Sequence, residues 1–200
     1  MIIPISSAHA AKTDNLPDAL LPAIRNRWSI RSFGPEALSA QVLTTIFEAA
    51  RWSASSMNAQ PWRFEISFRH QERYQAFFQA LSSGNQAWAG NAPVLGLAYT
   101  LTELPEYKVA NRHAMFDLGA AMSAMFIQAA ELGILGHLMG GYDAEKAAAL
   151  VQEERPHEIG CFFVLGYPGM PELLDEPYLT REWTPRQRLP LAELVKGLEG

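Results

Sequence analysis

Apolar side chains recur at helical spacing between Ala40 and Arg51, where they form one stripe, and Ser39 directly precedes this stretch. A serine at that position caps a helix by accepting a hydrogen bond from a backbone amide of the first turn. The pattern therefore predicts an amphipathic helix over 40–51. Three shorter helices are predicted over 22–27, which Pro22 can open, 74–81 and 144–152.

Other stretches have the spacing or the length of strands. Residues 64–68 alternate apolar and polar side chains, which predicts a half-buried strand. Nearly continuous apolar runs predict strands over 94–99, 134–139 and 158–166. Residues 82–85, which include glycine and asparagine, predict the end of the preceding helix, and residues 101–106 predict a loop.

The longest predicted element is a helix over 107–132, which would reach about 40 Å at ~1.5 Å per residue. From Ala114 onward it is apolar on nearly every face, so other elements have to surround it. Its many small residues would let a second helix approach closely, and a symmetry mate is the simplest supplier, so we expect a homodimer. Asp117, Gln128 and Glu131 interrupt the apolar run, which argues against a membrane span and for a core helix.

The two ends of the chain lack a long periodic pattern. Residues 1–16 are interpreted as a leader, either disordered or lying over a neighbouring element. The tail over 167–200 carries five of the 13 prolines, so it cannot be regular for long. Its amphipathic last piece, 191–198, can dock on a core. We therefore predict one domain over 17–200, of α+β class, with strands and helices packed in layers.

Composition narrows the classes of function. With 200 residues, 22.2 kDa and 48% hydrophobic residues, the chain can bury the core of a single domain. A net charge of -5 argues against nucleic acid as a partner, because phosphate backbones require a basic face. The single cysteine, Cys161, excludes an internal disulfide and fits a reducing compartment, so we expect a cytoplasmic protein. The five histidines lack the spacing of a helical metal pair, and no metal site is expected.

The segment 27–31, called the arginine segment below, carries Arg27, Ser29 and Arg31 at alternate positions. In an extended conformation these side chains project from one side of the chain. Guanidinium groups donate paired hydrogen bonds to phosphate, so the pattern predicts a site for a small anionic ligand. Arg186 and Arg188 in the tail either join this site or are solvated surface charges.

A second segment, 54–60, called the polar loop below, is rich in small donors and acceptors, and Pro61 stops any helix there. Such a loop can lie against a flat polar ring, but serine and asparagine beside proline also favour a simple capped turn. Gly140 and Gly141 follow a predicted strand, where their amides either point at an acceptor or form an ordinary turn. Neither a Gly-x-Gly-x-x-Gly nor a Gly-x-x-x-x-Gly-Lys-Ser/Thr motif is present.

The arginine segment and the Ser-Ser-x-Asn-x-Gln-Pro-Trp run at 55–62 resemble the two signature segments of the FMN-dependent nitroreductase family. The resemblance extends from about residue 22 to 191. It implies a central mixed or antiparallel sheet flanked by helices, with a long buried helix at the interface of a homodimer that holds two FMN molecules.

The resemblance also implies roles for individual residues. Arg27, Ser29 and the late arginines would hold the FMN phosphate, Arg31 would reach the N1/O2 edge of the ring, and the polar loop would contact the flavin of the partner subunit. This chain has Ala54 where a proline is common and Trp88 where several relatives have a lysine, which leaves Arg31 as the main cation at that edge. The cofactor-binding residues so implied are Arg27, Trp28, Ser29, Arg31, Ser55, Ser56, Met57, Asn58, Gln60, Asn85, Met139, Gly140, Gly141, Arg186 and Arg188.

The activity implied by the resemblance is NAD(P)H oxidation by a ping-pong cycle. NAD(P)H leaves a hydride on flavin N5, and a nitroaromatic, quinone or similar small-molecule acceptor then takes it in the same cleft. Because protons can come from water, no catalytic side chain is expected. The alternatives are a narrower flavin enzyme, such as an enone reductase or a reductive dehalogenase, a non-catalytic FMN-binding protein, and a helical dimer used only for interaction.

Overall fold

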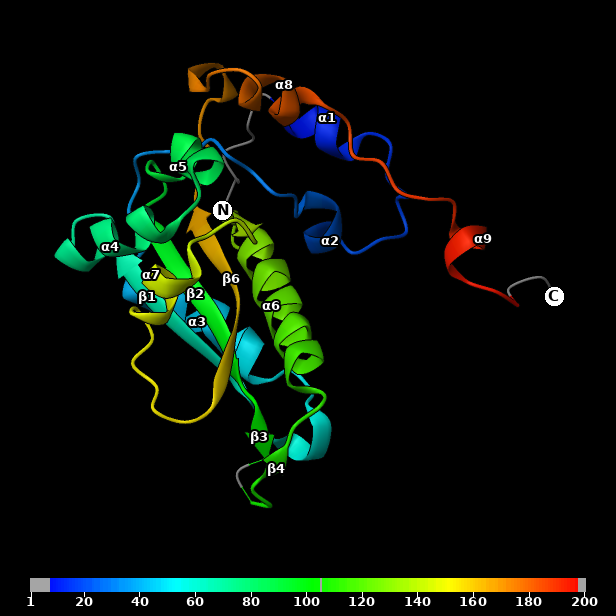
Figure 1. Ribbon diagram of the computed structural model, residues 1–200. Coiled ribbons are helices and arrows are strands. Elements are labelled where there is room, and N and C mark those ends of the chain that lie inside the picture. The colour runs from blue at the N-terminus through cyan, green and yellow to red at the C-terminus, as the bar shows by residue number, and fades with distance from the viewer. Residues whose placement is uncertain (1–7, 105, 198–200) are drawn as a thin grey trace.

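The computed structural model describes residues 8–104 and 106–197, and its centre is a four-stranded sheet (Figure 1). The strands lie in the order β1 (Trp62–Phe68), β2 (Val94–Leu101), β6 (His157–Gly166) and β5 (Leu135–Met139). Every neighbouring pair is antiparallel. The predicted α+β class is confirmed, and the sheet is antiparallel rather than mixed.

Helices cover both faces of the sheet. One face packs against α3 (Ala40–Arg51) and α6 (Ala114–Glu131), and Figure 1 shows α6 alongside the sheet. The other face packs against α4 (Glu72–Ala80), α5 (Ser83–Ala89), α7 (Ala144–Ala148) and the arginine segment. Three layers result, and the arginine segment lies on the α4 and α5 side.

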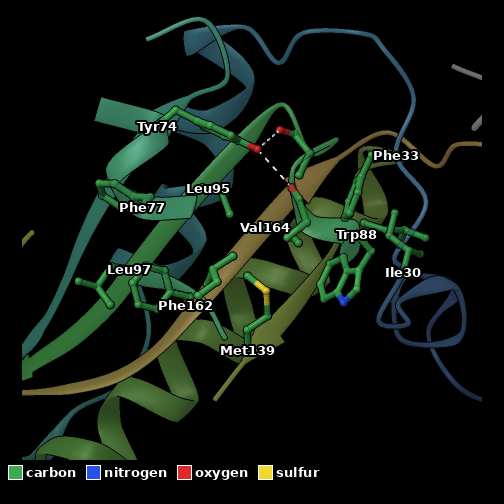
Figure 2. Packing of buried hydrophobic residues seen from close by; sticks show 14 of the residues in the cluster. Ile30, Phe33, Tyr74, Phe77, Trp88, Leu95, Leu97, Met139, Phe162 and Val164 are labelled. Carbon is green, nitrogen blue, oxygen red and sulfur yellow. Dashed lines mark hydrogen bonds between the residues drawn. The ribbon is translucent and has the colours of Figure 1, made fainter. Parts of the chain in front are cut away.

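Alternation along the strands builds these two cores. On β2, Leu95 and Leu97 join the core of the α4 side, whereas Val94 and Ala98 join the core of the α6 side. Figure 2 shows the first core, where the hydroxyl of Tyr74 donates to the carbonyl of Ala92 over 2.7 Å. Burial raises the pKa of Tyr74 to about 12, so this hydroxyl stays a donor at neutral pH.

Several predicted elements have the expected bounds because local patterns define them. Helix α3 spans the predicted range, and the hydroxyl of Ser39 accepts from the amide of Val42 over 3.2 Å. Helix α2 (Pro22–Asn26) begins at the predicted proline. All four predicted strands are present, and Gly133 ends α6 with a φ of 75°, as a C-terminal glycine does.

The long helix begins later than predicted. It starts at Ala114, and the preceding residues form a hairpin of β3 (Glu103–Leu104) and β4 (Val109–Ala110) instead of a loop and a helix. Lys108 has a φ of 50°, which no α-helix accommodates. The prediction was wrong because the apolar pattern starts only at Ala114, and the polar residues before it were assigned to the helix without any stripe to support them.

The helix before residues 82–85 ends close to the predicted place, at Ala80, but residues 83–89 then form a further helix, α5, which was not predicted. The amides of Asn85 and Gln86 both donate to the carbonyl of Ser82, each over 2.9 Å. Trp88 is only 2% exposed, so burial of its ring stabilises a helix that Gly84 and Asn85 disfavour locally.

The leader and the tail lie side by side. Residues 1–7 of the predicted leader lie outside the described residues, but α1 (His9–Thr13) is helical and packs next to α8 (Tyr178–Trp183) (Figure 1). The ammonium of Lys12 donates to the carbonyls of Arg181 over 2.8 Å and Thr184 over 2.5 Å. These bonds cap the C-terminal end of α8.

The amphipathic last piece can dock on a core, but as far as residue 197 it does not dock on the core of its own chain. After η2 (Pro171–Leu173) and α8 the chain runs past α1 to α9 (Leu191–Leu194), which lies far from the sheet in Figure 1. Leu191 and Leu194 are 63% and 60% exposed. Of the helices that the structure describes, none combines the length and apolar character needed to cross a membrane.

Candidate functional site

The arginine segment is extended and fastened to the edge of the sheet. Ser29 pairs with Gly136 of β5 in an isolated parallel bridge. Trp28 and Ile30 are 3% and 1% exposed, so they face the core, while Arg27, Ser29 and Arg31 lie on the outer side. This is the alternation that the sequence predicts, and it presents two guanidinium groups and a hydroxyl from one side of the segment.

Arg27 and Arg188 form a cationic pair that has no acidic partner among the described residues. Burial, and then the nearby charge of Arg188, lower the pKa of Arg27. Neither residue takes part in an ion pair within residues 8–104 and 106–197. Like charges held together without an acid favour an anion between them. The pair borders a cavity of about 630 Å³ whose other lining residues are Asn15, Leu16, Pro17, Leu20, Ile24, Arg186 and Gln187.

Arg186 lies beside this pair, and three of its five N–H donors are already used. Its guanidinium donates to the carbonyls of Lys12 over 2.5 Å, Arg27 over 2.7 Å and Arg25. Burial and the charge of Arg27 lower its pKa to about 10. These bonds place Arg186 where it joins the tail, α1 and the start of the arginine segment, and it also lines the cavity that Arg27 and Arg188 border.

A second cavity, of about 280 Å³, lies at the other end of the arginine segment and is called the β5 cavity below. It brings together the predicted residues Arg31, Asn85, Met139, Gly140 and Gly141. The remaining lining residues are Ser82, Gly84, Trp88, His137, Leu138, Tyr178 and Arg181. Residues from α5, β5, α8 and the arginine segment thus meet in one place.

The wall of the β5 cavity is shaped by Gly141. The side-chain amide of Asn85 donates to the carbonyl of Gly141 over 2.9 Å. A Cβ atom on Gly141 would lie 2.6 Å from Oγ of Ser82, so a larger residue there requires Ser82 to shift, whereas a Cβ on Gly140 would meet nothing within 4 Å. Met139 is 1% exposed and packs in the core (Figure 2), which leaves Gly140 and Gly141 as the open part of this wall.

Three charged side chains and an indole act on the cavity: Arg31 and Arg181 line it, Glu182 lies beside Arg31, and the indole is that of Trp88. The guanidinium of Arg31 lies 5.8 Å from the ring centroid of Trp88, a cation–π arrangement. Its Nη1 is 3.5 Å from Oε1 of Glu182 on α8. Burial lowers the pKa of Arg31, and the carboxylate of Glu182 opposes that shift. Arg31 therefore stays a cation at the cavity, with one weak acidic neighbour.

His137 is a neutral member of this wall. Its Nδ1 is 3.1 Å from the carbonyl oxygen of Ile30, and because a carbonyl only accepts, Nδ1 must carry the proton and Nε2 must be bare. Burial, and then the charge of Arg31, lower the pKa of His137 to about 4. Neither role can be inferred from the sequence, since His137 has no partner at a recognisable spacing and Glu182 is a lone acid in an irregular tail.

The polar loop lies elsewhere in the same chain. Ser55, Ser56, Met57, Asn58 and Gln60 line neither of the two cavities above. The loop follows α3, contains the turn η1 (Ser56–Asn58), and packs next to the start of α6. There a cavity of about 270 Å³ is lined by Ala54, Ser55, Ser56, His113, Phe116 and Asp117.

The backbone of the polar loop is strained. Met57, Asn58 and Gln60 have φ values of 53°, 53° and 46°. Each such non-glycine residue costs on the order of 1 kcal/mol or more, so surrounding contacts have to impose the conformation. Asp117 provides one, since its Oδ2 accepts from the amide of Ser56 over 3.1 Å, and the hydroxyl of Ser55 accepts from the amide of Gln60 over 3.0 Å.

Comparison with known proteins adds the family context. An oxidoreductase containing FMN has a solved structure that is 30% identical, with a TM-score of 0.84, over 94% of this chain and 96% of that one. A Desulfovibrio desulfuricans protein in complex with FMN is 24% identical, with a TM-score of 0.71, over 92% and 98% of the two chains. A nitroreductase family protein from Streptococcus pneumoniae is 17% identical, with a TM-score of 0.70, over 87% and 97%.

Sequence relatives give the same picture. A 15.4 kDa protein of Mycolicibacterium smegmatis is 34% identical over 86 residues, which are 42% of this chain and 56% of that protein. The chain thus spans little more than half the length of this relative. Residues 24–167 match the Nitroreductase family, and this range contains the arginine segment, the polar loop and the turn at Gly140 and Gly141, called the diglycine turn below. The chain belongs to the nitroreductase family.

Proposed function

We propose that the protein is an FMN-dependent NAD(P)H oxidoreductase that passes a hydride to a nitroaromatic, quinone or similar small acceptor. The observation that carries the proposal is the arrangement along the arginine segment. At one end lie Arg27 and Arg188, which have no acidic partner among the described residues, and at the other end lies the β5 cavity. A flavin mononucleotide has the matching chemistry, with a phosphate at one end and a planar ring at the other. The 30% identical oxidoreductase contains FMN, which supports this choice of ligand.

The residues present fit the phosphate end of FMN. Arg27 and Arg188 would hold the phosphate, since their guanidinium groups lie together without a carboxylate among the described residues. The exposed hydroxyl of Ser29 lies on the same side of the segment as Arg27. Charge-assisted hydrogen bonds of this kind are about twice as strong as neutral ones, so most of the binding energy would come from here.

The residues around the β5 cavity fit the ring. Arg31 would face the pyrimidine edge, where its cation stabilises negative charge, and Asn85 with the open backbone at Gly140 would orient the opposite edge. When bound, FMN supplies the hydride chemistry. The side chains bind and orient it, and NAD(P)H is the reductant that the proposal requires.

The proposal includes a homodimer, because the polar loop lies apart from the β5 cavity of its own chain. Apolar side chains near this loop are exposed: Trp52 is 77%, Met57 is 64% and Phe116 is 78% exposed. The tail adds Leu191 and Leu194, which have no core of their own to cover them. A second copy would cover these surfaces, and the strained loop would then serve the flavin of the partner.

An absorption titration tests the proposal. Purified protein, with and without added FMN, should show a bound-flavin spectrum that bleaches under nitrogen on addition of NADH or NADPH, and a nitroarene or a quinone should restore the oxidised spectrum. Arg27→Ala serves as the weak-binding variant. A protein that binds FMN without being bleached would be a flavin carrier, and one that ignores FMN would refute the assignment of the site.

A further inference from the structure

Glu182 is a buried acid for which the proposed hydride transfer has no use. It lies on α8, is 1% exposed, and comes within reach of the arginine segment although 151 positions separate it from Arg31. Its Oε1 lies 3.5 Å from Nη1 of Arg31, a long contact for a charged pair. Its Oε2 has no hydrogen-bond partner in the part of the chain that the structure describes.

The charges around Glu182 come from three parts of the chain. Arg31 faces it from the arginine segment, and Lys12 faces it from α1, but the ammonium of Lys12 donates to carbonyls of the tail instead. Arg186, in the tail beyond α8, lies near Lys12. On α8 itself, Tyr178 and Arg181 lie near Arg31. The carboxyl group is therefore surrounded by cations, yet directly bonded to them only weakly.

Burial and these cations act on Glu182 in opposite directions. Desolvation is the larger effect and raises the pKa of the carboxyl to about 7, while Arg31 and then Lys12 lower it. A buried carboxylate with one unbonded oxygen is costly, so the protonated form becomes competitive. Near neutral pH the carboxyl group of Glu182 can therefore gain or lose a proton when the charge nearby changes slightly.

We propose that Glu182 is a positioning residue that gains or loses a proton and thereby controls how much of the Arg31 charge acts on a flavin in the β5 cavity. The inference rests on the proposed function. When Glu182 is ionised, it pairs with Arg31 and offsets its charge; when it is protonated, the cation of Arg31 is left for the cavity.

Reduction of the bound flavin adds negative charge beside Arg31, and Glu182 then accepts a proton from solvent. The O–H bond of the carboxyl group forms as the flavin is reduced and breaks when it is reoxidised. The electrons come from the reductant, and Glu182 itself is neither oxidised nor reduced. Each two-electron reduction thus takes up one proton more than the flavin alone requires, and reoxidation releases it.

The test is a redox titration of the FMN-loaded protein against pH. Between the pKa of about 7 and the higher pKa that Glu182 would have beside reduced flavin, the ratio of reduced to oxidised flavin at a fixed solution potential should fall about a hundredfold per pH unit in the wild type, since two protons accompany two electrons. In Glu182→Gln the fall should be about tenfold, since one proton remains. Glu72→Gln, which changes an exposed acid on α4, should behave like the wild type.

A measurement on the unmodified protein covers the case in which Glu182→Gln does not fold. The infrared difference spectrum between oxidised and reduced protein should contain the carbonyl stretching band of a newly protonated carboxyl group at pH 8. A tenfold fall per pH unit in the wild type, or the absence of that band, overturns the role of Glu182 while leaving flavin binding and reduction in place. Failure to bind or reduce FMN overturns the proposed function instead, so the two failures are distinguishable.

Discussion

The amide of Ser56 donates to Oδ2 of Asp117 over 3.1 Å, and this bond ties the polar loop to the first turn of α6. Asp117 is 3% exposed, so its carboxylate has little access to water that could replace the bond. Side-chain spacing does not reveal this bond, since the two residues are 61 positions apart. The strained backbone of the loop depends on such contacts.

Replacing Asp117 tests this dependence. Asp117→Ala should lower the free energy of unfolding by about 1 to 3 kcal/mol, because it leaves a buried amide without its acceptor. It should also weaken FMN binding if the loop serves the flavin of a second copy, as proposed above, since the released loop would relax. Chemical denaturation and a flavin titration measure the two effects. Asp143→Ala, which removes the N-terminal cap of α7, should lower stability by about 1 kcal/mol and leave FMN affinity unchanged.

Removing either member of the cationic pair should affect binding rather than folding. Arg27→Ala and Arg188→Ala should each weaken FMN affinity by about 2 kcal/mol, while the folded state loses a like-charge repulsion and keeps its stability. Isothermal titration with FMN measures the loss. Arg155→Ala, which removes an exposed arginine paired with Glu153, is the control and should bind FMN normally. Wild-type affinity in both test variants would contradict the phosphate assignment.

Removing Arg186, in contrast, should affect the stability of the fold. Arg186→Ala leaves three carbonyl groups without their charged donor, so it should lower the free energy of unfolding by about 2 kcal/mol or more. The loss should be local, because these bonds join α1, the arginine segment and the tail. Limited proteolysis should therefore cleave the tail near residue 186 faster in the variant. Stability equal to that of the wild type would show that the carbonyl bonds are unimportant.

Glu182 and His137 should give the protein a stability profile in which two trends cancel. The pKa of Glu182 is raised to about 7 from 4.5, so the folded state binds more protons than the unfolded one in that window, and stability falls as the pH rises through it. The pKa of His137 is lowered to about 4 from 6.5, so its contribution is lost as the pH falls through that window.

In Glu182→Gln, of these two contributions to the pH dependence of stability, only that of His137 should remain. The apoprotein variant should then gain stability from about pH 4 to 6.5, and it should be more stable than the wild type at pH 8, by up to about 3 kcal/mol at 1.36 kcal/mol per pKa unit. Urea denaturation at a series of pH values measures both quantities. Parallel curves for variant and wild type would contradict the raised pKa of the carboxyl group.

The elements that could be predicted are those whose signal is local. Helix α3, with its stripe and its Ser39 cap, and the alternation of the arginine segment follow from side-chain spacing and needed no knowledge of distant residues. Helix α5 could not be predicted, because the glycine and asparagine preferences at 84–85 act locally and burial of Trp88 overrides them through the tertiary fold.

In the candidate site, too, features with a local sequence signal could be predicted and features that only the tertiary fold creates could not. Of the β5 cavity wall, the residues implied by a family resemblance carried by short motifs are Arg31, Asn85, Met139, Gly140 and Gly141. The role of Arg186 in joining segments could not be predicted, since three carbonyl groups that only folding brings together capture three of its donors. Glu182 reaches Arg31 across 151 positions from a proline-rich tail, and no spacing rule connects them.

Two variants of the diglycine turn, Gly141→Ala and Gly140→Ala, separate the effect of a steric clash in the cavity wall from a direct effect on ligand binding. Gly141→Ala places a Cβ atom 2.6 Å from Oγ of Ser82 and 3.2 Å from the side-chain amide of Asn85, so it should lower stability by about 1 to 3 kcal/mol and displace the wall of the β5 cavity. Gly140→Ala meets nothing within 4 Å and should fold with wild-type stability. Thermal unfolding and FMN titration distinguish the two.

A second substitution identifies the atom responsible for the clash. The double variant Ser82→Ala/Gly141→Ala removes the Oγ contact and leaves the Cβ of residue 82 at an ordinary 3.4 Å, so it should recover most of the stability that Gly141→Ala loses. Ser82→Ala alone is the control for the missing hydroxyl. If the double variant is as unstable as Gly141→Ala, the strain arises from Asn85 instead. FMN affinity should then depend on whether Asn85 still donates to the carbonyl of residue 141.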